Sequence, residues 1–129
     1  MEQSKYLIDT NVVIDYLGQK LPDSGMRFVS TIIDTVSNIS VVTKIEVLGF
    51  NAPNEHYQTL NDFMNDSTIW HLVDKIIEVS IEVRKKYKTK LPDAIIAATA
   101  LVHGLVIISR NVKDFQNIDG LTCINPHDL

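Results

Sequence analysis

Short apolar runs alternate along this chain with longer segments in which apolar residues recur at intervals of three and four. The short runs have the length of buried strands, and they predict strands over 5–8, 39–42, 68–72, 105–108 and 121–124. The longer segments carry one apolar face at helical spacing, and they predict helices over 12–17, 28–36, 43–50, 54–65, 74–87 and 92–103. This alternation indicates βαβ units and a mostly parallel sheet. We therefore expect one α/β domain that spans residues 1–129.

The segment 90–115 carries the clearest signals for its elements. Pro92 suits the first turn of a helix, where its missing N–H is no loss, and Gly104 suits the left-handed position just after a helix. The continuous apolar run that follows is typical of a strand buried on both faces. Asp93 begins the helix and Asp114 lies in the polar turn after the strand. Two acids therefore flank a single helix–strand unit.

Two further acids occupy corresponding places. Asp9 ends the first predicted strand and Glu46 lies in the helical turn after the second, as Asp114 follows the fourth. Crossover helices run antiparallel to the strands of a parallel sheet, so Asp93, at a helix start, belongs to the same edge. We expect all four carboxylates at the edge of the sheet where the strands end.

Each acid also has a structural explanation when it is taken alone. Thr43 and Glu46 have capping-box spacing, Asp93 complements a helix dipole, and Asp9 and Asp114 suit turns or caps. Taken together, however, four like charges at one edge raise one another's pKa values. A bound divalent cation relieves this repulsion, and oxygen-only ligands favour Mg²⁺ or Mn²⁺.

Composition narrows the class of protein. A share of 45% hydrophobic and 22% charged residues is ordinary for a globular protein, and the net charge of −4 argues against broad, nonspecific binding of nucleic acid. The single cysteine, Cys123, excludes an internal disulfide, and the four histidines show no metal-ligand spacing. No signal peptide is evident, and the longest apolar tract, 94–108, is too short to span a membrane. We expect a cytoplasmic protein without a membrane segment.

The acids belong to four motifs that run in order through nearly the whole chain. These are Ile8-Asp9-Thr10-Asn11-x-x-Ile14-Asp15, Thr43-x-x-Glu46, Leu91-Pro92-Asp93-Ala94-x-Ile96-Ala97-Ala98-Thr99-Ala100 and Ser109-Arg110-Asn111-x-x-Asp114-Phe115. As a set they resemble the PIN-domain ribonucleases, and most closely the VapC-like toxins of bacterial toxin–antitoxin pairs. The resemblance implies a single-domain, three-layer α/β/α sandwich around a mostly parallel sheet.

The resemblance also implies roles for residues. It makes the four acids the catalytic, metal-binding quartet: Asp9, Glu46, Asp93 and Asp114. It places supporting side chains at Thr10, Asn11, Ser109 and Asn111. The implied activity is a metal-dependent endoribonuclease in which one or two Mg²⁺ or Mn²⁺ ions activate water, since no His or Lys general base is evident. Glu46 is either a metal ligand or the residue that orients the attacking water.

Basic residues are candidates for RNA contacts. The dense run that leads to the Asp93 motif contains Arg84, Lys85, Lys86, Lys88 and Lys90, and Arg110 and Lys113 stand beside the last acid. These cations either follow an RNA backbone or form a solvated helix end. Tyr87, within the run, is more typical of a core residue than of a base-stacking platform.

The expected partners are an RNA substrate, a cognate antitoxin protein and a second copy of the chain in a homodimer. Apolar residues of two helices serve either the core, which is the usual role, or an antitoxin groove or dimer face: Met26, Phe28, Phe63 and Met64.

Other functions fit the pattern less well. A haloacid-dehalogenase-like phosphatase needs a second Asp where this chain has Asn11, and a receiver domain needs an acidic pair and a lysine that are not found here. A catalytically silent PIN-like domain that serves as an RNA- or protein-binding scaffold remains the alternative.

Overall fold

The computed structural model describes residues 5–129. Within them a five-stranded, all-parallel sheet lies at the centre, in the order β3-β2-β1-β4-β5. The strands are β1 (Tyr6–Ile8), β2 (Asn38–Ser40), β3 (Thr68–Trp70), β4 (Val106–Ile108) and β5 (Cys123–Ile124). The predicted mostly parallel sheet is confirmed, with each strand shorter than its apolar run.

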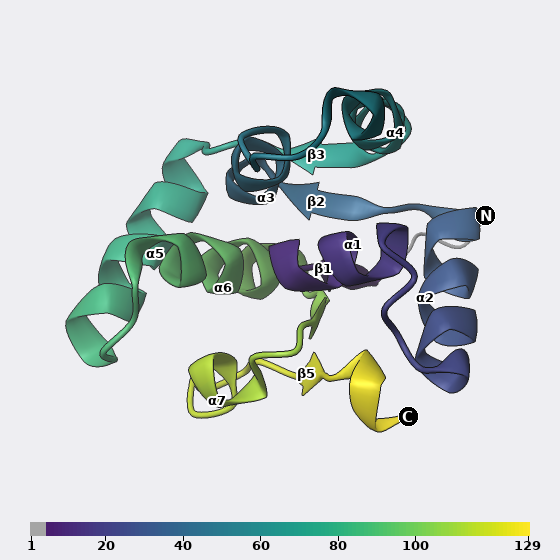
Figure 1. Cartoon of the computed structure of the whole chain (residues 1–129). Helices are drawn as coiled ribbons and strands as arrows, with labels where there is room; N and C mark the ends of the chain where they lie inside the picture. The colour runs from purple at the N-terminus through teal and green to yellow at the C-terminus, as the bar shows by residue number, and fades with distance from the viewer. Residues whose placement is uncertain (1–4) are drawn as a thin grey trace.

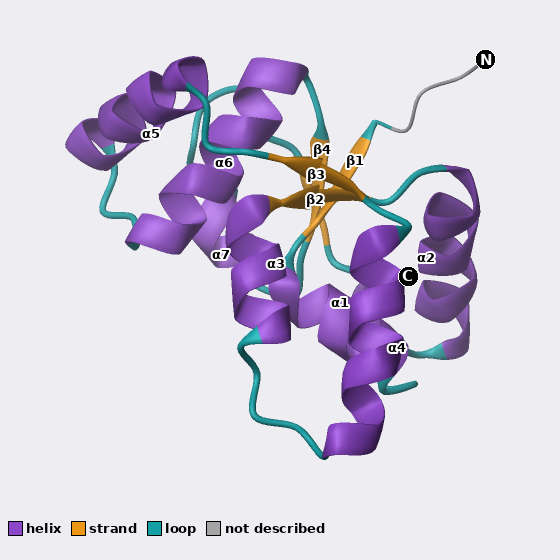
Figure 2. Cartoon of the chain, turned by 90° about the horizontal axis from the view of Figure 1, so that it is seen from above, coloured by secondary structure: helices purple, strands orange, loops and turns teal. Residues whose placement is uncertain are grey.

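Helices cover both faces of this sheet. They are α1 (Thr10–Leu17), α2 (Asp23–Thr35), α3 (Val41–Leu48), α4 (Asn54–Asn65), α5 (Asp74–Lys86), α6 (Leu91–His103), α7 (Val112–Phe115) and the 3₁₀ turn η1 (Pro126–Asp128). Figure 1 shows their order along the chain, and Figure 2 shows α5 and α6 on one side of the strands and α2 on the other. The expected three-layer α/β/α sandwich is confirmed.

The alternation of side chains along the central strands forms two cores. In β1, Leu7 packs with α5 and α6, whereas Ile8 packs with α1, α2 and α4. In β4, Ile107 and Ile108 divide in the same way, and all four side chains are at most 1% exposed. This two-residue period explains why continuous apolar runs form central strands.

The prediction that a strand covers 39–42 is wrong at its end. β2 ends at Ser40, whose hydroxyl accepts a hydrogen bond of 3.1 Å from the N–H of Val42 and so caps α3. Thr43 is consequently inside the helix and fully buried, so Thr43 and Glu46 do not form a capping box. The apolar pattern alone does not distinguish the end of a buried strand from the first turn of a helix.

Two other boundaries differ from the prediction. α2 begins at Asp23 rather than at Phe28, because its first turn is polar and lacks the apolar period. The polar turn after β4 contains a one-turn helix, α7. The four apolar residues weighed for a groove or dimer face pack in the core on the α1 side of the sheet: Met26, Phe28, Phe63 and Met64.

The 90–115 unit is formed as predicted. Pro92 stands in the first turn of α6, and Gly104 ends the helix in the left-handed conformation with φ 64°. Residues 94–100 are almost completely buried, and their small alanines allow α6 to lie close to the sheet. This packing fixes the position of the Asp93 end of the helix. No helix in residues 5–129 is long and apolar enough to cross a membrane.

Candidate active site

Asp9 leaves the central strand at the edge where the parallel strands end. Its side chain is 4% exposed and caps α1, with Oδ1 accepting a hydrogen bond of 2.8 Å from the N–H of Thr10. Oδ2 accepts hydrogen bonds from the Ser109 hydroxyl at 2.7 Å and from the Asn11 amide at 3.2 Å. Burial nevertheless raises the pKa of Asp9 above its ordinary value, although these three hydrogen bonds act in the opposite direction.

A polar network joins the ends of β1 and β4 around this carboxylate. Asn11 Oδ1 accepts a hydrogen bond of 3.0 Å from the N–H of Arg110, and the Ser109 hydroxyl accepts one of 3.0 Å from the N–H of Asn111. Ser109 is fully buried. Because β1 and β4 are neighbouring strands, side chains about a hundred residues apart in sequence fix one another at this edge.

Glu46 reaches the same edge from α3. Its Oε1 accepts a hydrogen bond of 2.6 Å from the hydroxyl of Thr10, which also lies 3.2 Å from the hydroxyl of Thr43. Glu46 is therefore held by a residue next to Asp9 rather than by the start of its own helix.

A cavity of about 450 Å³ brings the acids together. It is lined by Asp9, Glu46 and Asp93, together with Thr10, Asn11, Ile14, Asp15, Lys20, Phe50, Arg110 and Asn111. The pKa of Asp93 is raised to about 6 by burial and then by the charges of Asp9 and Asp114, with Glu46 adding to them and Lys90 opposing them. The acids at this edge therefore disfavour one another's ionisation at the start of α6.

Asp114 occupies a different position from the other three acids. It is exposed on α7 and does not line the cavity, although its charge contributes to the raised pKa of Asp93. Of the four predicted site acids, three thus meet at one cavity and the fourth lies beside it.

The donor set at this edge consists of carboxylate, hydroxyl and amide oxygens, which are the donors that Mg²⁺ and Mn²⁺ prefer. No three Asp, Glu, His or Cys side chains in residues 5–129 are arranged as a ready-made metal cluster. Asp9 and Glu46 are instead each held by their own hydrogen bonds. The residues fit a divalent cation by chemistry and charge.

The basic residues divide into two groups. Arg110 lines the cavity, whereas the 84–88 part of the predicted run does not. There Lys85 and Lys86 pair with acids at 3.8 Å and 3.3 Å in exposed salt bridges. Tyr87 is half-buried against the core on the α6 side, and its hydroxyl accepts a hydrogen bond from the N–H of Asp119, in agreement with a core role.

Sequence reasoning missed four residues of the cavity: Ile14, Asp15, Lys20 and Phe50. Asp15 belongs to a motif but lies inside a helix, and only its burial, at 5% exposed, distinguishes it from a surface acid. Lys20 and Phe50 stand after the ends of α1 and α3, where local sequence carries no signal for a site.

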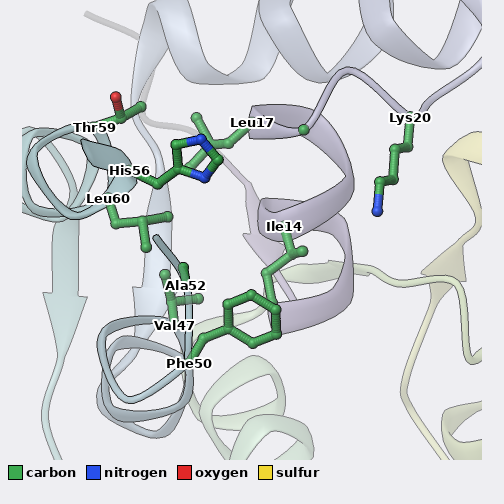
Figure 3. Close-up of a pocket in the computed structure, with 10 residues that line it drawn as sticks. Ile14, Leu17, Lys20, Val47, Phe50, Ala52, His56, Thr59 and Leu60 are labelled. Carbon is green, nitrogen blue, oxygen red and sulfur yellow. The ribbon is translucent and has the colours of Figure 1, made fainter. Parts of the chain in front are cut away.

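An apolar groove of about 390 Å³ adjoins the cavity. Figure 3 shows its lining from α1, the end of α3 and α4, and it shares Ile14, Lys20 and Phe50 with the acid cavity. Phe50 is 48% exposed, so a large apolar side chain borders both spaces.

Cys123 and the histidines do not form a metal cluster within residues 5–129. Burial raises the pKa of the Cys123 thiol to about 11, so the thiol stays neutral in β5. His103 stacks on Trp70 with ring centroids 4.0 Å apart, and His127 contacts Asp15.

The chain is similar in sequence and fold to known proteins. The family model described as PIN domain matches residues 6–121. Ribonuclease VapC1 of Methanocaldococcus jannaschii is 27% identical over 91% of this chain and 83% of its own length. The structure of a toxin-antitoxin complex from Klebsiella pneumoniae is 33% identical over 94% of this chain and 97% of that chain, with a TM-score of 0.78. A DNA-bound VapBC from Salmonella typhimurium, 20% identical over 96% and 99% of the two chains, has the same fold, with a TM-score of 0.81.

Proposed function

The chain belongs to the PIN domain family, and from this membership we propose that it is a metal-dependent endoribonuclease and the toxin of a toxin–antitoxin pair. The observation that carries the proposal is the cavity at the carboxyl edge of the sheet, where Asp9, Glu46 and Asp93 converge. Its similarity to the VapC1 ribonuclease and to a chain of the Klebsiella toxin-antitoxin complex supports this proposal.

The acids have separate roles in this proposal. Asp9 and Asp93 hold the cation, with Asp114 beside them, and Glu46 either binds the cation or orients the attacking water. A divalent ion bound there supplies charge neutralisation at the scissile phosphate and activation of water for hydrolysis. Ser109 and Asn11 keep the Asp9 carboxylate in place, and Thr10 does the same for Glu46.

The partners follow from the same proposal. The proposed substrate is RNA, and the proposed place of action is the cytoplasm. The proposed protein partner is a cognate antitoxin. The apolar groove of Figure 3 is a suitable surface for one of its apolar segments, because the groove shares Ile14, Lys20 and Phe50 with the acid cavity. A second copy of the chain completes the proposed assembly.

The test is cleavage of total bacterial RNA by the purified chain, with Mg²⁺, with Mn²⁺ and with a chelator. We expect discrete fragments that require the metal and disappear in Asp9→Asn. Circular dichroism of the variant checks that it folds. If well-folded, antitoxin-free protein binds the metal and leaves RNA intact, the catalytic proposal is wrong and the chain is a PIN-like scaffold.

A further inference from the structure

Asp15 is a buried carboxylate with no role in the proposed cation site. Its side chain is 7% exposed, and its Oδ2 takes two donors at once: Arg110 Nη1 at 3.2 Å and His127 Nε2 at 2.9 Å. An oxygen occupied by two donors is poorly suited to bind a cation. The arrangement instead ties a cavity residue to the C-terminal turn.

The three residues of this contact come from distant parts of the chain. Asp15 is on α1, Arg110 is in the turn after β4, and His127 is in η1. The backbone of each neighbouring segment is also fixed: the N–H of Arg110 donates to Asn11 at 3.0 Å, and the N–H of His127 donates to Asn125 at 2.9 Å. Arg110 is thus held both at its backbone N–H and at one nitrogen of its guanidinium.

Close packing keeps η1 in place beside α2. A Cβ atom at Gly25 would lie 2.0 Å from the carbonyl oxygen of Pro126, so only glycine permits this approach. The packing of the Pro126 backbone against Gly25 therefore holds the neighbouring His127 beside Asp15.

Arg110 lines the same cavity as the acids, and its guanidinium contacts Asp15, which also lines it. The Arg110 side chain is 53% exposed and lines the space with Asp9, Glu46 and Asp93. A guanidinium has five N–H donors, and a planar fork of this kind matches phosphate oxygens. Asp15 uses one Arg110 nitrogen, which leaves others for a ligand.

We propose that Arg110 binds the RNA phosphate beside the scissile bond, and that Asp15, held by His127, positions its guanidinium. This inference rests on the proposed nuclease function and extends it to three residues. The Asp15–His127 contact fixes the orientation of a long, flexible side chain before substrate arrives, which lowers the entropy that binding has to overcome.

Binding to a short, fluorescein-labelled single-stranded RNA of mixed sequence tests the role of Arg110. Measured by anisotropy in an Asp93→Asn background, which keeps the RNA intact, Arg110→Ala is expected to weaken binding about tenfold. It also reduces the slope of log Kd against log salt by about 0.7, the value for one phosphate contact on a single strand. A change in folding alone leaves this slope unaltered.

A double-mutant cycle tests the positioning pair. In the protein with intact acids, His127→Ala is expected to lower kcat/KM through a higher KM, and His127→Gln, whose amide N–H replaces Nε2–H, restores it. In an Arg110→Ala background His127→Ala has no further effect. Asp128→Asn, on the same 3₁₀ turn and exposed, is the control that leaves activity unchanged.

Each outcome decides between the two proposals. If the parent chain neither binds nor cleaves RNA, the nuclease function itself fails. If it cleaves RNA and Arg110→Ala alters neither Kd nor the salt slope, only the phosphate contact is refuted. If His127→Ala lowers kcat/KM equally with and without Arg110, the pair is a structural latch and not a positioning device.

Discussion

At the scale of single residues, burial and neighbouring charge decide the chemistry of the candidate site. Asp93 has a pKa of about 6, against an ordinary value of 3.8. The carboxyl group of Asp93 therefore binds its proton more tightly in the folded protein than in the unfolded chain. Its contribution to stability is present below pH 4 and is lost as pH rises from about 4 to about 6.

This shift predicts how Asp93→Asn changes stability. The variant has no charge to desolvate or to repel the other acids, so in the presence of a chelator, which keeps the cation site empty, we expect its melting temperature at pH 7 to exceed that of the parent. The difference shrinks toward pH 4, where Asp93 is protonated in the parent. Calorimetry across this pH range measures it, and a difference independent of pH would contradict the assigned pKa.

Ser109 illustrates the second residue-scale effect, the orientation of a carboxylate by one hydroxyl. Ser109→Ala leaves Asp9 Oδ2 with the Asn11 amide alone, and loss of a hydrogen bond to a charged group predicts a loss of about 2 kcal/mol in the free energy of unfolding. Loss of a residue that orients a metal ligand predicts a fall of about 10–100-fold in cleavage.

A matched control separates the two losses. Ser80 is also buried, and its hydroxyl donates only to the carbonyl of Ile76 in its own helix. Ser80→Ala is expected to cost less than about 1 kcal/mol and to leave cleavage unchanged. Urea denaturation and RNA cleavage assays measure both variants. Equal activity losses would mean that Ser109 acts through stability alone.

At the scale of elements, two glycines show different reasons for the absence of a side chain. Gly104 has φ 64°, and a Cβ there meets nothing within 4 Å, so its requirement is conformational. Gly25 lies in α2, and a Cβ there would collide with the Pro126 backbone, so its requirement is space. The first ends α6, and the second joins α2 to η1.

These reasons predict different effects of alanine. Gly104→Ala is expected to cost about 1 kcal/mol, the penalty for a left-handed residue with a Cβ. Gly25→Ala forces α2 and η1 apart, and its cost is expected near the upper end of the range of about 1–3 kcal/mol for overpacking. Urea denaturation compares the two. A smaller loss for Gly25→Ala would show that η1 moves aside easily.

At the scale of the whole molecule, an apolar stripe is exposed along α5. Val73, Ile77 and Ile81 recur at intervals of four and are 52%, 38% and 48% exposed, and Leu72 beside them is 46% exposed. A stripe of this kind on one helix suits an interface between two copies of the chain. The homodimer stays a prediction, and the apolar stripe of α5 is the surface that we expect to form its interface.

The stripe predicts the effect of a single charge on assembly. Ile77→Glu is expected to shift the protein to a monomer, because an interface buries the new carboxylate unpaired. Lys75→Glu introduces the same side chain on the same helix outside the stripe and is expected to leave the mass unchanged. Light scattering after size-exclusion chromatography gives the masses. A dimer that survives Ile77→Glu would place the interface elsewhere.

The sequence by itself determined the elements and the edge at which the acids lie. The apolar period is a local property and the edge follows from parallel-sheet geometry, so all four acids were expected at one edge. Asp9, Glu46 and Asp93 line one cavity, whereas Asp114 lies outside its lining. The end of β2 was predicted wrongly, because Val41 and Val42 suit a strand and a helix equally and the cap at Ser40 decides between them.

Only the tertiary structure decided which side chains meet. The strand order β3-β2-β1-β4-β5 makes β1 and β4 neighbours, and this adjacency brings Ser109 to Asp9 and Arg110 to Asp15. The packing of η1 on α2 brings His127 to the same carboxylate, 112 residues along the chain. The period of a helix or strand fixes which face a residue occupies. Contacts across such distances depend on how whole elements pack, which no local pattern encodes.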